Sequence, residues 1–190
     1  MKTQSISFGK TPVMKCIVKE VSGKNKHCAT LYQMDTKNPE DFKEIKYSKS
    51  SRCLIPAFQN DISKHNPAYN YYLLKNDTTG EVISCAQTSK RFKMGSGKYS
   101  GMSTLIDEMV ENTGYLNGGV PLLAYLAHKS EMQSENFVSS ALRLEDTPSL
   151  KIAKFTKLRN GDWFIPKNRY QLLIDIAEKR VNALFLDTVV

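Results

Sequence analysis

Carboxylates and glycines stand close together between residues 107 and 121, and both can do chemistry. Asp107, Glu108 and Glu111 lie within the segment LIDEMVE, and the turn NGGVP follows shortly after it. A positioned carboxylate can act as a general base. Free N–H groups at the start of a helix, together with the helix dipole, bind anions such as phosphate. The spacing therefore places candidate bases just before a candidate phosphate site.

The glycine turn has two interpretations, and the sequence leaves both open. Gly118 and Gly119 allow the backbone to approach a ligand closely. A Gly-Gly-Val-Pro turn between a strand and a helix also joins the two elements without any ligand. A second glycine loop, GSGKYS at 95–100, lacks the spacing of a nucleotide-triphosphate loop. With its lysines it either guides an anion or is simply solvated.

The carboxylates need a strand to position them. The segment MSTLIDEMVEN predicts a strand over 102–112, although its apolar residues also fit a short helix. On a strand, neighbouring side chains point to opposite faces. Regular alternation then places Glu108 on one face with Ile106 and Val110, and Asp107 on the other. After the turn, leucines at helical spacing, with Pro121 in the first turn, predict a helix over about 121–133.

The remaining patterns predict a mixed α/β domain. Strands are predicted at 13–23, 68–75, 81–89 and 136–145, and 28–35 is either a strand or the start of a helix. Hairpins are predicted around NDTTG (76–80) and around Asn160-Gly161. Helices are predicted at 39–49 and 55–65. We expect a single domain over 1–190, with a polar tail at about 1–12 and a C-terminal helix at about 168–186.

Composition narrows the partners and the compartment. The net charge of +8 favours anionic partners, including nucleic acid, although a solvated basic surface explains it equally well. The cysteines form no CxxC pair and no His or Cys stands at metal spacing, so we expect buried thiols and no metal. No segment resembles a signal peptide or a membrane span, so we expect a cytoplasmic protein, with a secreted bacterial effector as the alternative.

The order of strand, helices, hairpin, strand, glycine turn, helix and strand resembles the GNAT superfamily of N-acetyltransferases over roughly 16–163. The segment YLNGGVPLLAYL stands where that family has an Arg/Gln-x-x-Gly-x-Gly/Ala loop. The resemblance implies an α/β (α+β) fold with a central, mostly antiparallel sheet flanked by helices. It also implies that acetyl-CoA, as co-substrate, is bound by Met109, Val110, Leu116, Asn117, Gly118, Gly119 and Val120.

The resemblance further implies catalytic roles. Glu108 is the preferred base for deprotonating the acceptor amine, and Glu111 is the second choice. The family often supplies a Tyr that protonates the departing thiolate, but the segment TPSLKIAKFTKLRNG contains none. Water or another tyrosine, Tyr99 or Tyr115, is a candidate substitute, and Tyr115 is equally well explained as a packing residue.

The turn departs from the family pattern. Leu116 replaces Arg or Gln, Asn117 replaces a glycine, and Pro121 removes one amide donor. Two functions therefore stay open. One is an acyl-CoA-dependent N-acyltransferase whose acceptor is an amine of a protein, an aminoacyl-tRNA or a small molecule. The other is a catalytically silent GNAT-like binding module, such as a bacterial effector or regulator.

Overall fold

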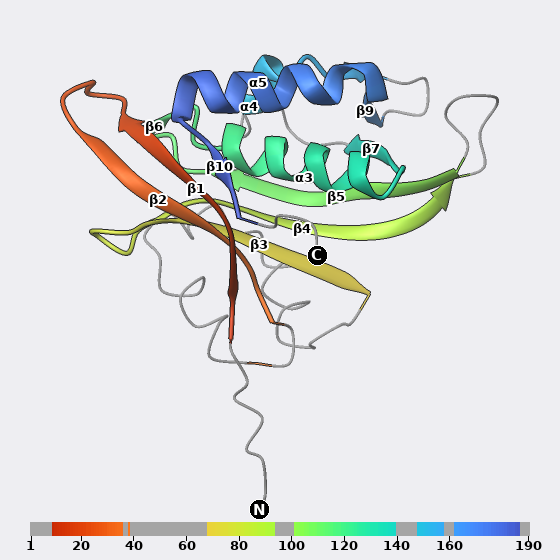
Figure 1. The fold of residues 1–190 in the computed structure, drawn as a ribbon, viewed down its shortest axis with the longest axis horizontal. Helices are drawn as coiled ribbons and strands as arrows, with labels where there is room; N and C mark the ends of the chain where they lie inside the picture. The colour runs from red at the N-terminus through yellow and green to blue at the C-terminus, as the bar shows by residue number, and fades with distance from the viewer. Residues whose placement is uncertain are drawn as a thin grey trace, which may run out of the picture.

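The computed structural model describes residues 9–35, 38, 68–93, 101–139, 148–157 and 162–186. Ten strands in these residues form one sheet. Their bounds are β1 Thr11–Glu20, β2 Lys26–Gln33, β3 Tyr69–Asn76, β4 Val82–Lys93, β5 Gly101–Glu111, β6 Tyr115–Leu116, β7 Asn136–Ser139, β8 Thr156–Lys157, β9 Trp163–Ile165 and β10 Leu184–Phe185. Their order is β10-β1-β2-β3-β4-β5-β7-β9-β8, with β6 paired to β1 (Figure 1). All the pairs are antiparallel except β5 with β7.

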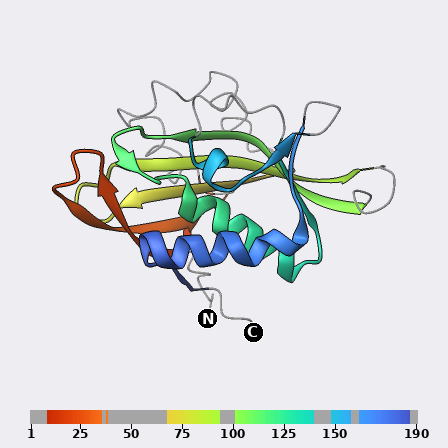
Figure 2. The same cartoon turned by 90° about the horizontal axis from the view of Figure 1, so that it is seen from above.

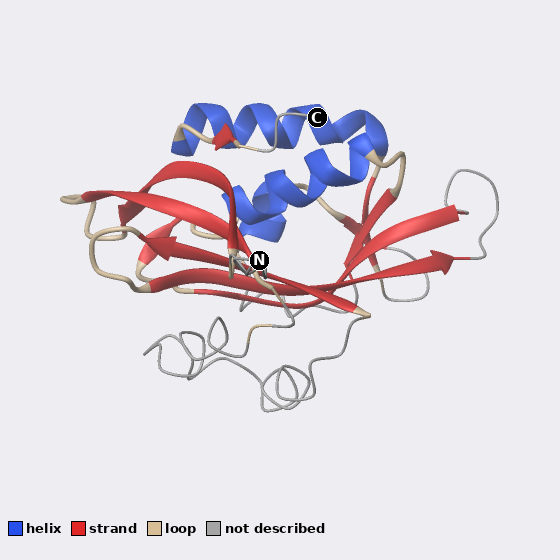
Figure 3. Ribbon diagram, turned by 60° about the horizontal axis from the view of Figure 1, so that its bottom comes forward, coloured by secondary structure: helices blue, strands red, loops and turns tan. Residues whose placement is uncertain are grey.

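The helices of the described residues lie on one side of this sheet (Figure 1). They are α3 (Val120–Met132), α4 (Ser149–Ile152), the 3₁₀ turn η3 (Lys167–Arg169) and α5 (Tyr170–Val181). Figures 2 and 3 show α3 and α5 together above the same face, which we call the helix-covered face. Residues 120–127 of α3 are all buried, because α3 is enclosed by the sheet on one side and α5 on the other. In contrast, α5 buries one face, including Leu173, Ala177 and Val181. It exposes Glu178, Lys179 and Arg180.

Both faces of the central strands are buried. On β3, Tyr72 and Leu74 belong to the core under α3, whereas Tyr71 and Leu73 belong to a second apolar cluster on the opposite face. Alternating side chains of one strand point to opposite faces, which explains this division. The run YYLL is apolar throughout because it contributes to two cores.

Most predicted elements are confirmed. Segment 102–112 is a strand, 28–35 lies largely in β2, and α3 matches the predicted helix at 121–133 almost residue for residue. The hairpin around NDTTG forms between β3 and β4, and the arms around Asn160-Gly161 pair as β8 and β9. The predicted helices at 39–49 and 55–65, the loop 95–100 and the end of the strand at 136–145 lie outside the described residues.

The two chain ends differ from the prediction. The C-terminal helix ends at Val181, because Asn182 adopts a left-handed conformation with φ 48°. Residues 184–185 then pair with β1 as β10, so the helix expected to reach 186 is too long. At the other end, β1 begins at Thr11, inside the expected tail. No helix in the described part of the chain is long and apolar enough to cross a bilayer.

Candidate functional site at the end of β5

A β-bulge in β5 decides where its carboxylates lie. Gln87 of β4 is the partner of Glu108, and the next residue, Thr88, is the partner of Ile106, so Asp107 is an extra residue on β5. A bulge shifts the alternation of side chains by one position. The regular alternation predicted from the sequence is therefore wrong at this point.

Glu108 consequently shares a face with Val110 but not with Ile106. Ile106 packs in the core under α3, whereas Val110 packs against the cluster on the opposite face. Glu108 stands two residues before Val110 on a regular stretch of strand, so it belongs to that opposite face and is half-buried. Before it, Asp107 accepts a hydrogen bond from the Arg91 guanidinium at 3.0 Å.

Glu111 lies on the helix-covered face and is the centre of a buried polar cluster. Only 7% of its surface is exposed. One carboxylate oxygen accepts from the Ser149 amide at 3.1 Å, and the other accepts from the Ser149 hydroxyl at 2.7 Å and the Gly119 amide at 3.1 Å. The Gly119 amide also lies 3.2 Å from the Ser149 hydroxyl oxygen. The carboxylate thus bridges the first residues of α3 and α4.

Burial and hydrogen bonding act on the pKa of Glu111 in opposite directions. Removal from water raises this pKa above its usual value, and the bonds from Ser149 and Gly119 lower it, with burial the larger effect. In the described residues no lysine or arginine pairs with Glu111, so backbone amides and one hydroxyl hold this carboxylate.

Position 119 requires a glycine because no room exists for a side chain, and not because of its backbone conformation. Its φ of −90° is available to any residue. A Cβ built on it, however, would lie 2.4 Å from the Glu111 carboxylate carbon and 2.6 Å from the end of Met109. The predicted role of the Gly119 amide as a phosphate donor does not fit this geometry, because the amide already donates to Glu111 and Ser149.

The other turn residues are also held by contacts within the chain. Asn117 takes the left-handed conformation at φ 58°, and its carbonyl accepts from the Val120 amide at 3.1 Å. The Gly118 carbonyl accepts from the Ser84 hydroxyl at 2.9 Å. Val120 is fully buried, and Leu116, 42% exposed, pairs with β1 through β6.

Tyr115 is a packing residue with an engaged hydroxyl. The hydroxyl donates to Glu81 at 2.8 Å and accepts from the Asn76 side chain at 3.2 Å. Burial raises the pKa of Tyr115, so the phenol keeps its proton at neutral pH. These contacts tie the turn to the β3–β4 hairpin, and they favour the packing interpretation over the catalytic one.

Ser149 is the site residue that the sequence analysis missed. The segment TPSLKIA precedes the second predicted hairpin, and it contains the short helix α4, which no sequence pattern above predicts. A signal was present, because Pro148 and Ser149 stand directly before apolar residues, a pattern typical of helix starts. α4 itself contains no Tyr.

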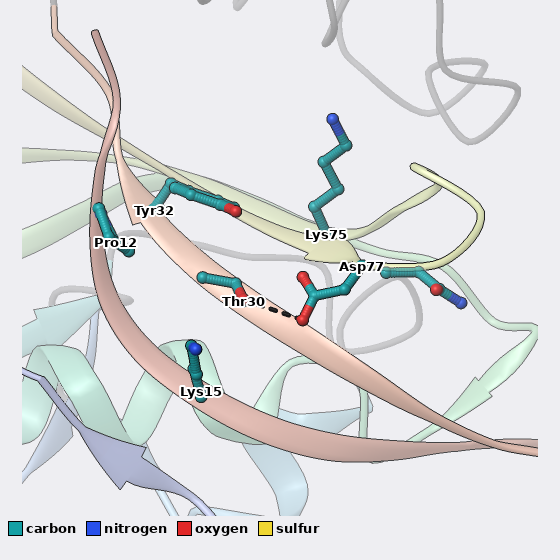
Figure 4. A pocket seen from close by; sticks show the side chains of 7 residues that line it. Pro12, Lys15, Thr30, Tyr32, Lys75 and Asp77 are labelled. Atoms are coloured by element: carbon teal, nitrogen blue, oxygen red, sulfur yellow. Dashed lines mark hydrogen bonds between the residues drawn. The ribbon is translucent and has the colours of Figure 1, made fainter. Parts of the chain in front are cut away.

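A separate hollow of about 460 Å³ lies over β1, β2 and β3 (Figure 4). Lys15 and Lys75 flank it, and Asp77 between them accepts from the Thr30 hydroxyl at 3.0 Å. Lys15 lies between Met14 and Cys16 on β1, and both of these belong to the core under α3. The hollow therefore faces away from α3 and does not include the Glu111 cluster.

The described residues contain no group of three metal-ligating side chains. Among the cysteines, Cys16 and Cys85 are buried, as expected, whereas Cys28 is exposed and Cys53 lies outside the described residues. Burial raises the pKa of Cys16 and of Cys85 to about 12, so neither is a thiolate at neutral pH.

The fold defines a class of protein: a mixed, mostly antiparallel sheet with helices packed on it and a parallel strand pair beside the turn. The structure of a mutant AtaT toxin bound to the C-terminus of the antitoxin AtaR is similar, with a TM-score of 0.54 and 14% identity over 76% of this chain and 96% of that one. AtaTR bound with AcCoA matches with the same TM-score and 15% identity over 76% of this chain and 97% of that one. The chain therefore has the GNAT-like fold, the mixed and mostly antiparallel sheet flanked by helices that the sequence predicts.

A weaker likeness, with a TM-score of 0.46 and 14% identity, is found to a predicted acetyltransferase with acetyl-CoA from Clostridium acetobutylicum, over 69% of this chain and 92% of that one. No protein-family model and no curated protein sequence matches the chain. At 14–15% identity the two AtaT structures establish the fold alone, and the activity is argued from the site.

Proposed function

We propose that the chain is an acyl-CoA-dependent N-acyltransferase that moves an acetyl group to a primary amine. The observation that carries the proposal is the β-bulge in β5, where Asp107 is an extra residue directly before Glu108. The residues of β5 before the bulge pair in parallel with β7. Bulges that end pairing and redirect a side chain are common beside active sites. The fold shared with AtaTR, which is bound with AcCoA, supports the choice of donor.

In this proposal Glu108 is the general base. It takes a proton from the acceptor amine, directly or through one water, and the amine nitrogen then attacks the thioester carbonyl carbon. The C–S bond breaks as the C–N bond forms, and the thiolate of coenzyme A leaves. α4 contains no Tyr and the Tyr115 hydroxyl is engaged elsewhere, so neither donates a proton to the departing thiolate. In this proposal water supplies that proton.

The test combines binding and turnover. We expect acetyl-CoA to raise the thermal midpoint in a concentration-dependent way, and we expect thiol release with a panel of amines. Glu108→Gln should lower the rate about 10²- to 10⁴-fold with little change in acetyl-CoA affinity. The matched control is Glu131→Gln, which removes an exposed carboxylate on α3. Unchanged turnover in Glu108→Gln would remove Glu108 from the mechanism.

A second candidate function is a catalytically silent binding module. One observation favours it specifically: the Gly119 amide, which the family would use for coenzyme A, is already bonded within the chain. The chain's net charge of +8 suits an anionic partner, and nucleic acid is the first to test. Binding to nucleic acid that weakens as the salt concentration rises would support this partner. The silent module is favoured if millimolar acetyl-CoA leaves the midpoint unchanged and no amine releases thiol.

A further inference from the structure

We propose that Arg91 is a specificity-determining residue of the acceptor site, and that the acceptor amine carries an anionic group, a carboxylate or a phosphate, which this guanidinium binds. The inference rests on the proposed function, because it names the class of acceptor in that reaction. It is drawn from the face of the sheet on which Arg91 lies, from the contacts that hold its side chain, and from the hydrogen-bond donors that remain.

Arg91 lies on the same face of the sheet as Glu108. On β4, Cys85 belongs to the apolar cluster that faces away from α3, and side chains alternate along a strand, so Gln87 and Arg91 share that face. Gln87 is the partner of Glu108 across β4 and β5. The Arg91 guanidinium contacts Asp107, the residue directly before Glu108. A small amine bound at Glu108 therefore lies within reach of Arg91.

Two contacts fix the guanidinium of Arg91. Its Nη2 donates to the Asp107 carboxylate at 3.0 Å, and its Nε donates to the Ser89 hydroxyl at 3.2 Å. Ser89 is buried and the Asp107 side chain is only 16% exposed, so both acceptors are themselves held within the sheet. A side chain that is already fixed loses less conformational entropy when a ligand binds. Arg91 is therefore pre-organised for binding.

The two contacts leave hydrogen-bond donors of Arg91 unused. A guanidinium has five N–H groups, and the bonds described above take one on Nε and one on Nη2. Within the described residues Nη1 has no hydrogen-bond partner, and 53% of the side chain is exposed to solvent. Planar guanidinium groups bind carboxylates and phosphates through two parallel hydrogen bonds. An anionic group on the acceptor matches the donors that remain.

The opposite charges of Glu108 and Arg91 fit an amine that also carries an anion. Glu108 attracts the ammonium form of the acceptor, and Arg91 attracts its anionic group. A neutral substituent lacks the second contact, and a positively charged one is repelled by Arg91. Binding at two points also restricts the orientation of the acceptor, which directs its nitrogen toward Glu108. Arg91 thus selects the acceptor and positions it.

The test compares amines that differ only in the anionic group: β-alanine with β-alaninamide, and phosphoethanolamine with ethanolamine. For each pair we take the ratio of the two kcat/KM values for thiol release from acetyl-CoA. Arg91→Gln should lower this ratio about 10- to 100-fold in at least one pair, because hydrogen bonds to a charged group are lost. The pair that responds identifies the anion as carboxylate or phosphate. Differences in intrinsic amine reactivity cancel when the ratio is compared with that of the wild type.

The matched control is Arg180→Gln, which changes the net charge equally from an exposed position on α5, above the helix-covered face. It should leave both ratios unchanged. A fall of the same size in Arg180→Gln would be a net-charge effect and would overturn the inference, as would unchanged ratios in Arg91→Gln. If Arg91→Gln does not fold, Arg91→Lys keeps the charge without the planar fork, and a smaller fall is expected. Unchanged ratios in Arg91→Lys would then reject the inference.

Product analogues separate this inference from the proposed function, because they need no turnover. The Nε–H resonance of Arg91 is followed while N-acetyl-β-alanine, N-acetylphosphoethanolamine or the uncharged N-acetyl-β-alaninamide is added. If no amine releases thiol but an anionic analogue alone shifts the resonance, the transferase proposal fails and the anion site at Arg91 is established. If no analogue shifts it and no amine reacts, both proposals fail. If amines react and Arg91→Gln leaves the ratios unchanged, the function stands and Arg91 has no part in choosing the acceptor.

Discussion

The sharpest prediction concerns Gly119→Ala, which adds one methyl group where the chain has no room. The added carbon would lie 2.4 Å from the Glu111 carboxylate carbon and 2.6 Å from the end of Met109. Carbon atoms pack at about 3.5–4.0 Å, so the carboxylate must move by about 1 Å. Met109 yields easily, because its methyl group ends a flexible side chain.

The expected loss of stability follows from the bonds that this movement breaks. Three donors hold the Glu111 carboxylate, and a hydrogen bond to a charged group contributes about 1.5–3 kcal/mol. Losing one or two of them lowers the free energy of unfolding by about 2–4 kcal/mol, in the range for overpacking of a buried site. Backbone strain adds nothing, because Gly119 has φ −90°.

The assay is urea unfolding followed by the fluorescence of Trp163, the only tryptophan. A double-mutant cycle makes the result specific. In a Glu111→Ala background the obstacle is gone, so Gly119→Ala should cost less than about 1 kcal/mol, with a coupling energy of about 2 kcal/mol between the two sites. An equal cost in both backgrounds, or almost none in the wild type, would refute the argument that Glu111 fills the space beside Gly119.

Two further predictions test the electrostatics of the site. Because burial raises the pKa of Glu111 in the folded state, the folded protein holds this proton more tightly than the unfolded chain. The free energy of unfolding of the wild type, relative to that of Glu111→Gln, should thus be greatest below pH 4.5 and should fall as the pH rises through the folded-state pKa. Urea titrations at several pH values in which this difference stays constant or rises would contradict the prediction. Tyr115→Phe should lower the free energy of unfolding by about 1–2 kcal/mol by removing the hydroxyl between Glu81 and Asn76. Its acyl-transfer rate per folded molecule should not change, and a lower rate would return Tyr115 to the chemistry.

The elements predicted well from the sequence are those with local causes. The β3–β4 hairpin follows from NDTTG between two β-rich segments, and Gly80 in its turn has φ 73°, which glycine adopts readily. Likewise, α3 follows from leucines at helical spacing and Pro121 in its first turn. In both cases neighbours along the chain supply the stabilising contacts, so the pattern is visible without the fold.

The site was harder to predict because its contacts are not local. The bulge at Asp107 is defined by the register of β5 against β4, and no feature within LIDEMVE shows it. Glu111 obtains two of its three hydrogen bonds from Ser149, which is 38 residues away. The sequence of a glycine turn before a helix does not show whether its amide is open to a ligand or bonded to a carboxylate from a neighbouring strand.

The bulge also decides the positions of two carboxylates, Glu108 and Glu111. With regular alternation starting from Ile106 on the helix-covered face, Glu108 would point toward α3, and Glu111 would point away from it. The extra residue Asp107 exchanges these positions. Glu111 then reaches the start of α3, and Glu108 lies on the opposite face with Val110. One inserted residue therefore places the proposed base and the buried Glu111 carboxylate on opposite faces of the sheet. A change in the register of β5 would move both carboxylates at once, so it should remove the proposed base and the contacts of Glu111 with Gly119 and Ser149 together.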